Sequence, residues 1–541
     1  MNDDCTIKHP TPFAAVRLGK HSAFPWECSD DGMCFARGNA FLPDGTLLDA
    51  KRLAEHVSHH LDEFGETLSA MDGFFAVIGA RADRVFAAVD RVRSFPLFYW
   101  RKSGFNITDS IDASDVADRS TDEESAVAFR NMYYTLGSTT LFRGVEQIPA
   151  GGICSFDSSG DVLDLRPEKR PSTRNVLLPE EAVSVIHRAN LDAVGKLVSL
   201  ANGRQLVVPL SGGHDSRMIL FYLKLSGYKN IVTYSYGRKR NEESVIAART
   251  ASVLGVPFYF IHYTRKLCVR VTAEHLDRYL MFAGNGVSCP MKQEFCAVWY
   301  LREQDLIARD AIFVPGYTGD VLAGSRVDYL MNRMAACGSV MDVDFVVDSI
   351  VSWHVRASAS KEDVAAIRQQ LKKIYFQNPS ACFTQEQCID GFEEVEFAER
   401  QAKFIENAVR IYEYWGFEWC TPYFFRNQFD AWGRISHELR RNRSAFKEVE
   451  KNIYSAELQK VPFASSPFPV LCRNRTMNKL IRKAVNFTSR FIPMPINYHY
   501  TYAMFPYWKT AIRFWAGKKG GDDMIVERYW SLMRHPTENN R

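Results

Sequence analysis

The residues best suited to chemistry lie in one short segment, Ser211-Gly212-Gly213-His214-Asp215-Ser216. It follows the apolar run Leu206–Leu210 and precedes a stretch with helical periodicity. Two glycines let the backbone approach an anion closely, and the start of a helix adds unpaired N–H groups and a positive dipole end. Serine hydroxyls can donate to phosphate oxygens. The segment therefore predicts a phosphate-binding loop, with these binding residues: Ser211, Gly212, Gly213, Asp215 and Ser216.

Asp215 places a carboxylate inside this loop, where it would repel a phosphate unless a cation lay between them. A second apolar run, Phe313–Pro315, leads into the glycine-rich turn Gly316–Gly324, which carries Asp320. Carboxylates and phosphates are the oxygen ligands that Mg²⁺ prefers. Asp215 and Asp320 are therefore predicted to bind Mg²⁺ against the phosphates of ATP. The alternative is that each aspartate only caps a helix.

The elements that position the first loop alternate between strand and helix. Strands are expected at residues 206–210, 231–236 and 258–263, with helices at 215–225 and 242–254 between them. This alternation predicts parallel strands with right-handed crossovers, which is a doubly wound α/β domain. Ligands bind such domains at the carboxyl edge of the sheet, where the loop begins. Helical periodicity dominates the chain beyond residue 265.

The N-terminal region has short apolar runs broken by turn residues. A helix is expected at Ala50–Leu61, and Gly73–Gly79 and Val85–Asp90 predict two strands joined by a polar turn. The pattern indicates a layered α+β domain rich in antiparallel strands, within a chain whose overall class is α/β. The expected boundaries are a first domain at 1–166, a linker at 167–179, a second domain at 180–480 and a C-terminal extension at 481–541.

Composition restricts the partners and the compartment. The chain has 541 residues and a formal net charge of +4, which gives no general argument for binding nucleic acid. Its 12 cysteines form no Cys-x-x-Cys pair, so neither a zinc finger nor a small disulfide framework is predicted. No secretory signal is visible at Met1–Asp4, and no run of about 18 apolar residues predicts a transmembrane helix. A cytoplasmic location is expected.

At these loops the chain resembles the asparagine synthetase family, ATP-pyrophosphatase amidotransferases with β-lactam synthetase and lasso-peptide cyclase relatives. The loop of that family is Ser-Gly-Gly-x-Asp-Ser, which Ser211–Ser216 matches. Gly316–Asp320 resembles its later Gly-x-Gly-Ser-Asp segment, and Glu418–Tyr423 partly matches its Glu-x-Arg-x-Pro-Phe segment. Lys447 falls where the family keeps a lysine for the pyrophosphate charge. The chain looks most like the asparagine-synthase-like proteins of bacterial surface-polysaccharide clusters.

The resemblance implies a glutaminase-like α+β domain, followed by a parallel-sheet ATP-pyrophosphatase domain with a helical C-terminal part. It implies activation of a carboxylate as an acyl-adenylate and conversion to an amide, with a sugar uronamide as the product in the polysaccharide group. Two alternatives stay open: a cyclase that uses an amine of the same molecule, and a catalytically idle scaffold. Tyr317 stands where β-lactam synthetases have a tyrosine. It could take part in proton transfer if Glu418 or Glu399 orients it, or it could merely line the pocket.

The N-terminal region departs from the family at the residue that hydrolyses glutamine. The family needs a cysteine directly after the initiator methionine, and Asn2 stands there. Cys5 would serve only if the four preceding residues were removed, and no Asn-Gly-Glu segment follows. Glutamine hydrolysis by this chain is therefore not expected. The expected nitrogen source is ammonia, supplied by a separate glutaminase, or another amine.

Overall fold

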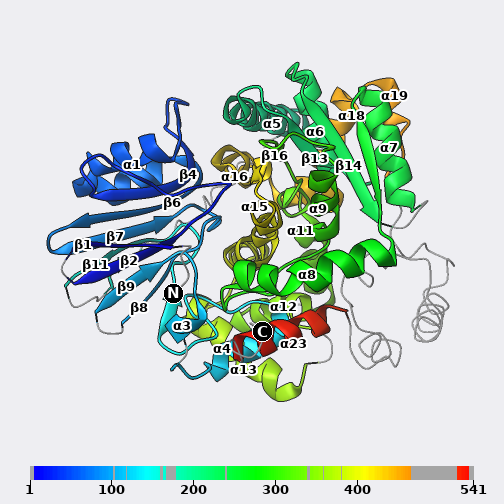
Figure 1. Ribbon diagram of the computed structural model, residues 1–541. Helices are drawn as coiled ribbons and strands as arrows, with labels where there is room; N and C mark the ends of the chain where they lie inside the picture. Colours follow the sequence, from blue (N-terminus) through cyan, green and yellow to red (C-terminus); the bar gives the residue numbers. More distant parts are fainter. Residues whose placement is uncertain are drawn as a thin grey trace.

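Three β-sheets organise the part of the chain that the computed structural model describes, as Figure 1 shows. Two of the sheets lie together in the N-terminal part, and the third, a parallel sheet, lies in the second part. Helices α15 (Arg410–Tyr414) and α16 (Arg426–Gly433) lie between the N-terminal sheets and the parallel sheet. The described residues are 5–11, 13–101, 104–116, 118–158, 162–165, 178–237, 241–337, 341–356, 359–378, 381–464 and 521–534.

The N-terminal sheets are mostly antiparallel. One has the strand order β1-β2-β9-β8-β10, in which only β2 and β9 are parallel, and the other has the order β12-β11-β7-β6-β4-β3, with β5 beside β4. The strands are β1 Cys5–Thr11, β2 Ala14–Gly19, β3 Glu27–Cys28, β4 Cys34–Phe41, β5 Leu47–Leu48, β6 Asp72–Arg81, β7 Arg84–Val89, β8 Phe98–Arg101, β9 Phe105–Thr108, β10 Val145–Gln147, β11 Ile153–Phe156 and β12 Val162–Leu165.

These two sheets pack face to face because apolar residues alternate along their strands. On β2 the buried positions are Ala14, Val16 and Leu18, which share one face. Across the interface the rings of Phe105 and Phe156 lie 4.5 Å apart. Helices α1 (Ala50–Ser58) and α2 (Phe64–Ala70) cover the outer face of the larger sheet with a separate apolar cluster. The N-terminal part is therefore layered, as the sequence predicts.

The third sheet has five parallel strands in the order β15-β14-β13-β16-β17. Its strands are β13 Leu206–Pro209, β14 Ile231–Gly237, β15 Phe258–His262, β16 Ile312–Phe313 and β17 Glu418–Trp419. Strands β14 and β15 lie in order on one side of β13, and the next strands along the chain, β16 and β17, lie in order on its other side. The order reverses between β13 and β16, so this is the switch point at which open α/β sheets bind ligands.

The helices that connect these strands have clear end signals. For α7 (Glu242–Leu254), the Asn241 side chain accepts the Ser244 amide at the start, and Gly255 ends the helix at φ 63°. The other helices up to β16 are α5 Pro179–Ala201, α6 Asp215–Leu225, α8 Arg265–Gly284 and α9 Phe295–Glu303.

A helical layer joins the two parts of the chain. Its apolar cluster combines α4 (Glu123–Met132) of the N-terminal part with helices that follow the second loop. The remaining helices are α3 Ala113–Val116, α10 Gly319–Leu322, α11 Ser325–Cys337, α12 Val343–His354, α13 Lys361–Tyr375, α14 Gln385–Val395, the π-helix η2 Glu396–Ile405, α17 His437–Arg440, α18 Ser444–Ile453, α19 Ala456–Gln459 and α23 Gly521–Arg534, with short 3₁₀ turns η1 Leu61–Glu63, η3 Glu406–Val409, η4 Pro422–Phe424 and η5 Arg441–Arg443.

The mixed α/β class with a parallel sheet is confirmed, and each strand and helix predicted around the first loop is present within two residues of its expected ends. The domain boundaries stay predictions. The linker at 167–179 lies outside the described residues except for its last two, and so does most of the extension at 481–541, of which α23 packs against α8. None of the described helices is long and apolar enough to cross a membrane.

Candidate functional site

The first glycine-rich loop connects β13 to α6, at the carboxyl edge of the parallel sheet. The Ser216 hydroxyl accepts the Ser211 amide at 3.2 Å, and the Ser211 hydroxyl accepts the Gly213 amide at 3.1 Å. These contacts fold the loop around its two serines. The first amides of α6 have no partners within the helix, so the loop presents hydrogen-bond donors and a helix N-terminus together.

Gly212 is required by a close backbone approach. The amide of Ala464 donates to the Gly212 carbonyl at 2.9 Å, and a Cβ atom on Gly212 would lie 2.7 Å from the Cβ of Ala464. Arg217, in the first turns of α6, donates to the carbonyls of Val461 and Pro462 at 2.9 and 2.6 Å. Hydrogen bonds therefore hold the segment 461–464 against one side of the first glycine-rich loop.

The second glycine-rich loop follows β16 and packs directly on the first. A Cβ atom on Gly316 would lie 2.9 Å from the Ser216 amide nitrogen, and one on Gly319 would lie 2.9 Å from both Cγ and Oδ1 of Asp215. Only residues without side chains allow this approach. The two loops thus come together at the switch point, and Asp320, in the first turn of α10, lies near Asp215.

Asp215 carries an unpaired, shielded oxygen. Its Oδ1 is out of contact with solvent and has no hydrogen-bond partner among the described residues. Burial, and then the charge of Asp320, raise the pKa of the Asp215 carboxyl. An unsatisfied carboxylate oxygen next to a second carboxylate is costly unless a cation binds both. The donor set therefore fits a hard divalent cation such as Mg²⁺.

The described residues hold no cluster of three or more metal-ligating side chains. Mg²⁺ demands six oxygen ligands and typically takes one or two of them from carboxylates, with phosphates and waters supplying the rest. Asp215 and Asp320 match that smaller protein contribution. The pair is suited to a cation that arrives with a phosphorylated substrate.

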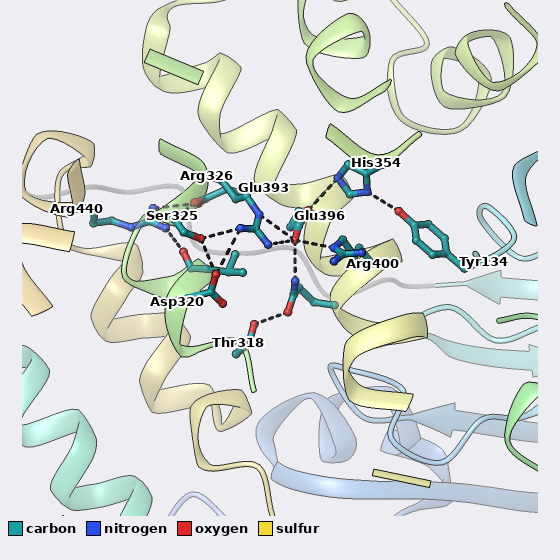
Figure 2. A network of polar contacts seen from close by, with 12 residues as sticks. Tyr134, Thr318, Asp320, Ser325, Arg326, His354, Glu393, Glu396, Arg400 and Arg440 are labelled. Atoms are coloured by element: carbon teal, nitrogen blue, oxygen red, sulfur yellow. Dashed lines mark hydrogen bonds and ion pairs between the residues drawn. The ribbon is translucent and has the colours of Figure 1, made fainter. Parts of the chain in front are cut away.

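Asp320 is anchored by a polar network drawn in Figure 2. Its Oδ2 accepts from the Ser325 hydroxyl at 2.9 Å and lies 3.5 Å from Nη1 of Arg326. Arg326 in turn donates through Nη2 to Glu396 at 3.0 Å. The network thus fixes the position of the second carboxylate.

Glu396 is the buried centre of this network. It accepts from Gln401 at 2.7 Å and lies 2.9 Å from Nε2 of His354, while the Thr318 hydroxyl of the second loop donates to Gln401 at 2.8 Å. Burial alone would raise the pKa of Glu396, but His354 and Arg326 hold it well below its usual range. Glu396 and Gln401 lie on the π-helix η2, a geometry that is frequent at functional sites. The second loop is therefore positioned by a buried network of hydrogen bonds and ion pairs.

Tyr317 lies in the second loop, partly buried at the same edge of the sheet. The carboxylates whose charge reaches it are Glu294 and Glu406, and burial followed by Glu294 raises the pKa of its phenol well above the usual value. Glu294 is buried and accepts the hydroxyls of Tyr234 and, at 2.8 Å, Tyr412. Burial raises its own pKa as well. Glu294 was not among the predicted site residues, because it lies in the connection before α9 and carries no motif.

The contacts that the structure shows for Glu418 and Glu399 are with residues other than Tyr317, so an orienting role for either stays a prediction. Glu418 begins β17 opposite Ile312, at the amino end of the sheet, and pairs there with Arg204 at 2.9 Å. Because β17 is only two residues long, the carboxyl edge is reached by the residues after it. Glu399 accepts from the Gly137 amide at 2.7 Å and from Lys403 at 2.6 Å, in the helical layer.

Lys447 is exposed on α18, and the described residues give it no contact with either loop. Besides Arg326, a second cation reaches Asp320: Arg443, directly before α18, lies 3.9 Å from Oδ2 of Asp320. The loop residue His214 is also held by α18, where Glu450 pairs with its Nδ1 at 2.8 Å, and its ring stacks on Phe463 at 3.7 Å. These contacts join residues far apart in the sequence, so no local sequence pattern predicts them.

The fold and these two loops define a mixed α/β protein with a glycine-rich site at the switch point of its parallel sheet. No protein-family model and no curated protein matches the chain. Among solved structures it is similar to glutamine phosphoribosylpyrophosphate amidotransferase from B. subtilis, complexed with ADP and GMP, at 12% identity and a TM-score of 0.18. The likeness covers 53% of this chain and 63% of that chain. At that TM-score it carries no argument, so membership of the asparagine synthetase family stays a prediction.

Proposed function

We propose that the chain is an ATP- and Mg²⁺-dependent carboxylate–amine ligase of the asparagine synthase type. It would activate a carboxylate as an acyl-adenylate and convert it to an amide, and the resemblance favours a sugar carboxylate that becomes a uronamide in surface-polysaccharide synthesis. One observation carries the proposal: the unpaired Oδ1 of Asp215 lies beside Asp320 where two glycine-rich loops meet at the switch point.

The first step would be adenylation. An oxygen of the substrate carboxylate bonds to the α-phosphorus of ATP, and the bond from that phosphorus to the β-phosphate bridge breaks, releasing pyrophosphate. In this proposal the backbone of Gly212 and Gly213, with the hydroxyls of Ser211 and Ser216, binds the phosphates. When bound, Mg²⁺ would neutralise phosphate charge beside Asp215 and Asp320.

The second step would be amide formation. The amine nitrogen bonds to the acyl carbon, AMP leaves with the electrons of the broken carbon–oxygen bond, and the nitrogen loses a proton. Glu294 is the carboxylate whose charge acts most strongly on Tyr317, and burial raises the pKa of Glu294, which makes it a better proton acceptor than an exposed glutamate. We therefore assign it the role first expected of Glu418, with Tyr317 in contact with the amine.

Pyrophosphate exchange tests the first step. The purified chain is incubated with ATP, MgCl₂, labelled pyrophosphate and a panel of carboxylates that includes uronic acids, amino acids and amine-bearing acids. Label should enter ATP with at least one carboxylate, and not in Asp215→Ala. Absence of exchange across the panel, in protein that unfolds cooperatively, would favour the idle scaffold.

Product analysis tests the second step. With the active carboxylate, ammonium should yield an amide 1 mass unit lighter than the acid, as –OH becomes –NH₂. A product lighter than the substrate by one water, formed without ammonium, would identify an intramolecular cyclase instead.

A further inference from the structure

A tight turn, 441–443, leads into α18 beside the two carboxylates. Asn442 and Arg443 both have left-handed backbones, with φ of 52° and 55°. The carboxylate of Asp328 holds this turn, since both of its oxygens accept the Asn442 amide at 3.0 and 2.9 Å. The turn is thus fixed from α11, the helix that follows the second loop.

Two successive left-handed residues are unusual when neither is glycine, because the Cβ atom crowds the backbone. Strained residues of this kind persist where the surrounding structure enforces them, and they cluster at ligand-binding positions. Glycine at either position would relieve the strain. Here the second left-handed position carries an arginine whose guanidinium reaches Asp320.

Arg443 is loosely engaged. Its ion contact with Asp320 is long, at 3.9 Å, and the described residues provide no hydrogen bond to its guanidinium. Arg326, the other arginine near Asp320, already has several partners. It donates to Glu396 and Ser325, and its guanidinium lies 4.7 Å from the ring centre of Trp353. Of these two cations, Arg443 is the one with donors left for another ligand.

We propose that Arg443 binds the β- and γ-phosphates of ATP and the pyrophosphate that leaves. Its guanidinium lies 3.9 Å from Oδ2 of Asp320, in the loop that packs directly on Asp215, so it stands at the edge of the carboxylate pair. A planar guanidinium presents five N–H donors and binds phosphate oxygens in pairs. With a cation on the carboxylates, the weak contact to Asp320 is easily exchanged for phosphate. The inference rests on the proposed function, and it transfers to Arg443 the role that the sequence assigns to Lys447.

Calorimetric titration with pyrophosphate tests the proposal, once with MgCl₂ and once in EDTA. In MgCl₂, Arg443→Gln should weaken pyrophosphate binding about 10- to 100-fold, because a charge-assisted bidentate contact is lost. In EDTA even the unmodified chain should bind pyrophosphate weakly, because Asp215 and Asp320 then repel it. The matched control is Arg441→Gln, since Arg441 lies two residues earlier and contacts Asp328 and Glu438 instead. That control should bind pyrophosphate as the unmodified chain does.

Arg443→Gly separates lost binding from lost folding. It removes the cation and relieves the left-handed strain, so the midpoint of thermal unfolding should rise while pyrophosphate binding falls. Misfolding cannot produce that combination. Unchanged pyrophosphate binding in both Arg443 variants, or a loss found in Lys447→Ala instead, would overturn the proposal.

The outcome for Arg443 is distinguishable from the outcome for the overall function. If the unmodified chain binds pyrophosphate through Arg443 but catalyses no exchange with any carboxylate, the proposed ligase fails and the phosphate site stands. If the unmodified chain exchanges label and Arg443→Gln has the same KM for pyrophosphate, the ligase stands and this inference fails.

Discussion

Asp215→Asn should stabilise the metal-free protein and abolish its pyrophosphate exchange. The side chain keeps its shape and loses only its charge, which burial and Asp320 make unfavourable. Each unit by which a folded-state pKa is raised costs the ionised protein about 1.4 kcal/mol. The amide remains unpaired at the former Oδ1 position, which costs part of this gain. We expect a net gain of about 1–2 kcal/mol at neutral pH, and a midpoint higher by about 1–2 °C for a chain of 541 residues.

The pH dependence of this gain follows from the direction of the shift. A carboxyl whose folded pKa is raised contributes most below its unfolded pKa of about 3.9, and that contribution is lost as the pH rises through the folded pKa. The difference in unfolding midpoint between Asp215→Asn and the unmodified chain should therefore be small near pH 4 and grow toward pH 8. Scanning calorimetry in EDTA measures it.

Magnesium supplies the counter-test. MgCl₂ with ATP should raise the midpoint of the unmodified chain, because ligand binding to the folded state stabilises it, and should leave Asp215→Asn nearly unchanged. If Asp215→Asn is less stable than the unmodified chain at every pH, or if it still exchanges pyrophosphate, the reasoning is refuted. That reasoning holds that the Asp215 carboxyl destabilises the metal-free fold and is needed to bind a cation.

Gly319→Ala should lower the rate of pyrophosphate exchange about 100-fold, because its Cβ atom would lie 2.9 Å from Asp215 and a displacement of about 1 Å can slow a reaction that much. The control is Gly195→Ala on α5, where an added Cβ atom would meet no atom within 4 Å, and it should leave the exchange rate unchanged. Tyr317→Phe should keep exchange and reduce amide formation by about 10²–10⁴-fold if the phenol relays a proton; a parallel fall in both would make it a pocket residue. Glutamine alone should not support amide formation, and glutamate release that is lost in Cys5→Ala would contradict this.

Local patterns account for what the sequence predicts correctly. The loop Ser211–Ser216 and its flanking strand and helix depend on residue types within about 20 positions, which periodicity and glycine placement report. The approach of Asp215 to Asp320 is also predictable, because adjacent parallel strands bring their carboxyl ends to one edge. Gly316 and Gly319 permit that approach, because a Cβ atom on either would lie 2.9 Å from an atom of the first loop.

The surroundings of the other candidate residues depend on long-range contacts. Glu418 lies opposite Ile312 at the amino end of the sheet, because its position along a two-residue strand, and not its motif, decides which edge it is near. Glu294 becomes important only when Tyr234 and Tyr412, more than 100 residues apart from one another, meet at its carboxylate. Arg443 reaches Asp320 from a turn with left-handed backbone conformations, which the sequence does not indicate because the turn contains no glycine. Sequence patterns within one helix or strand carry no information about contacts between residues that are far apart in the sequence.

The N-terminal part contributes to the site whether or not it has chemistry of its own. Arg37 of β4 is fully buried and donates at 2.7 Å to Glu413 of α15, which also accepts Nε1 of Trp419 on β17 at 3.0 Å. Burial lowers the pKa of Arg37 to about 10, so it stays charged at neutral pH. Removing one partner of a buried ion pair typically costs about 3–5 kcal/mol. β17 pairs with β16, the strand that leads into the second loop, so a charge in the N-terminal sheet supports the strand from which Asp320 is presented.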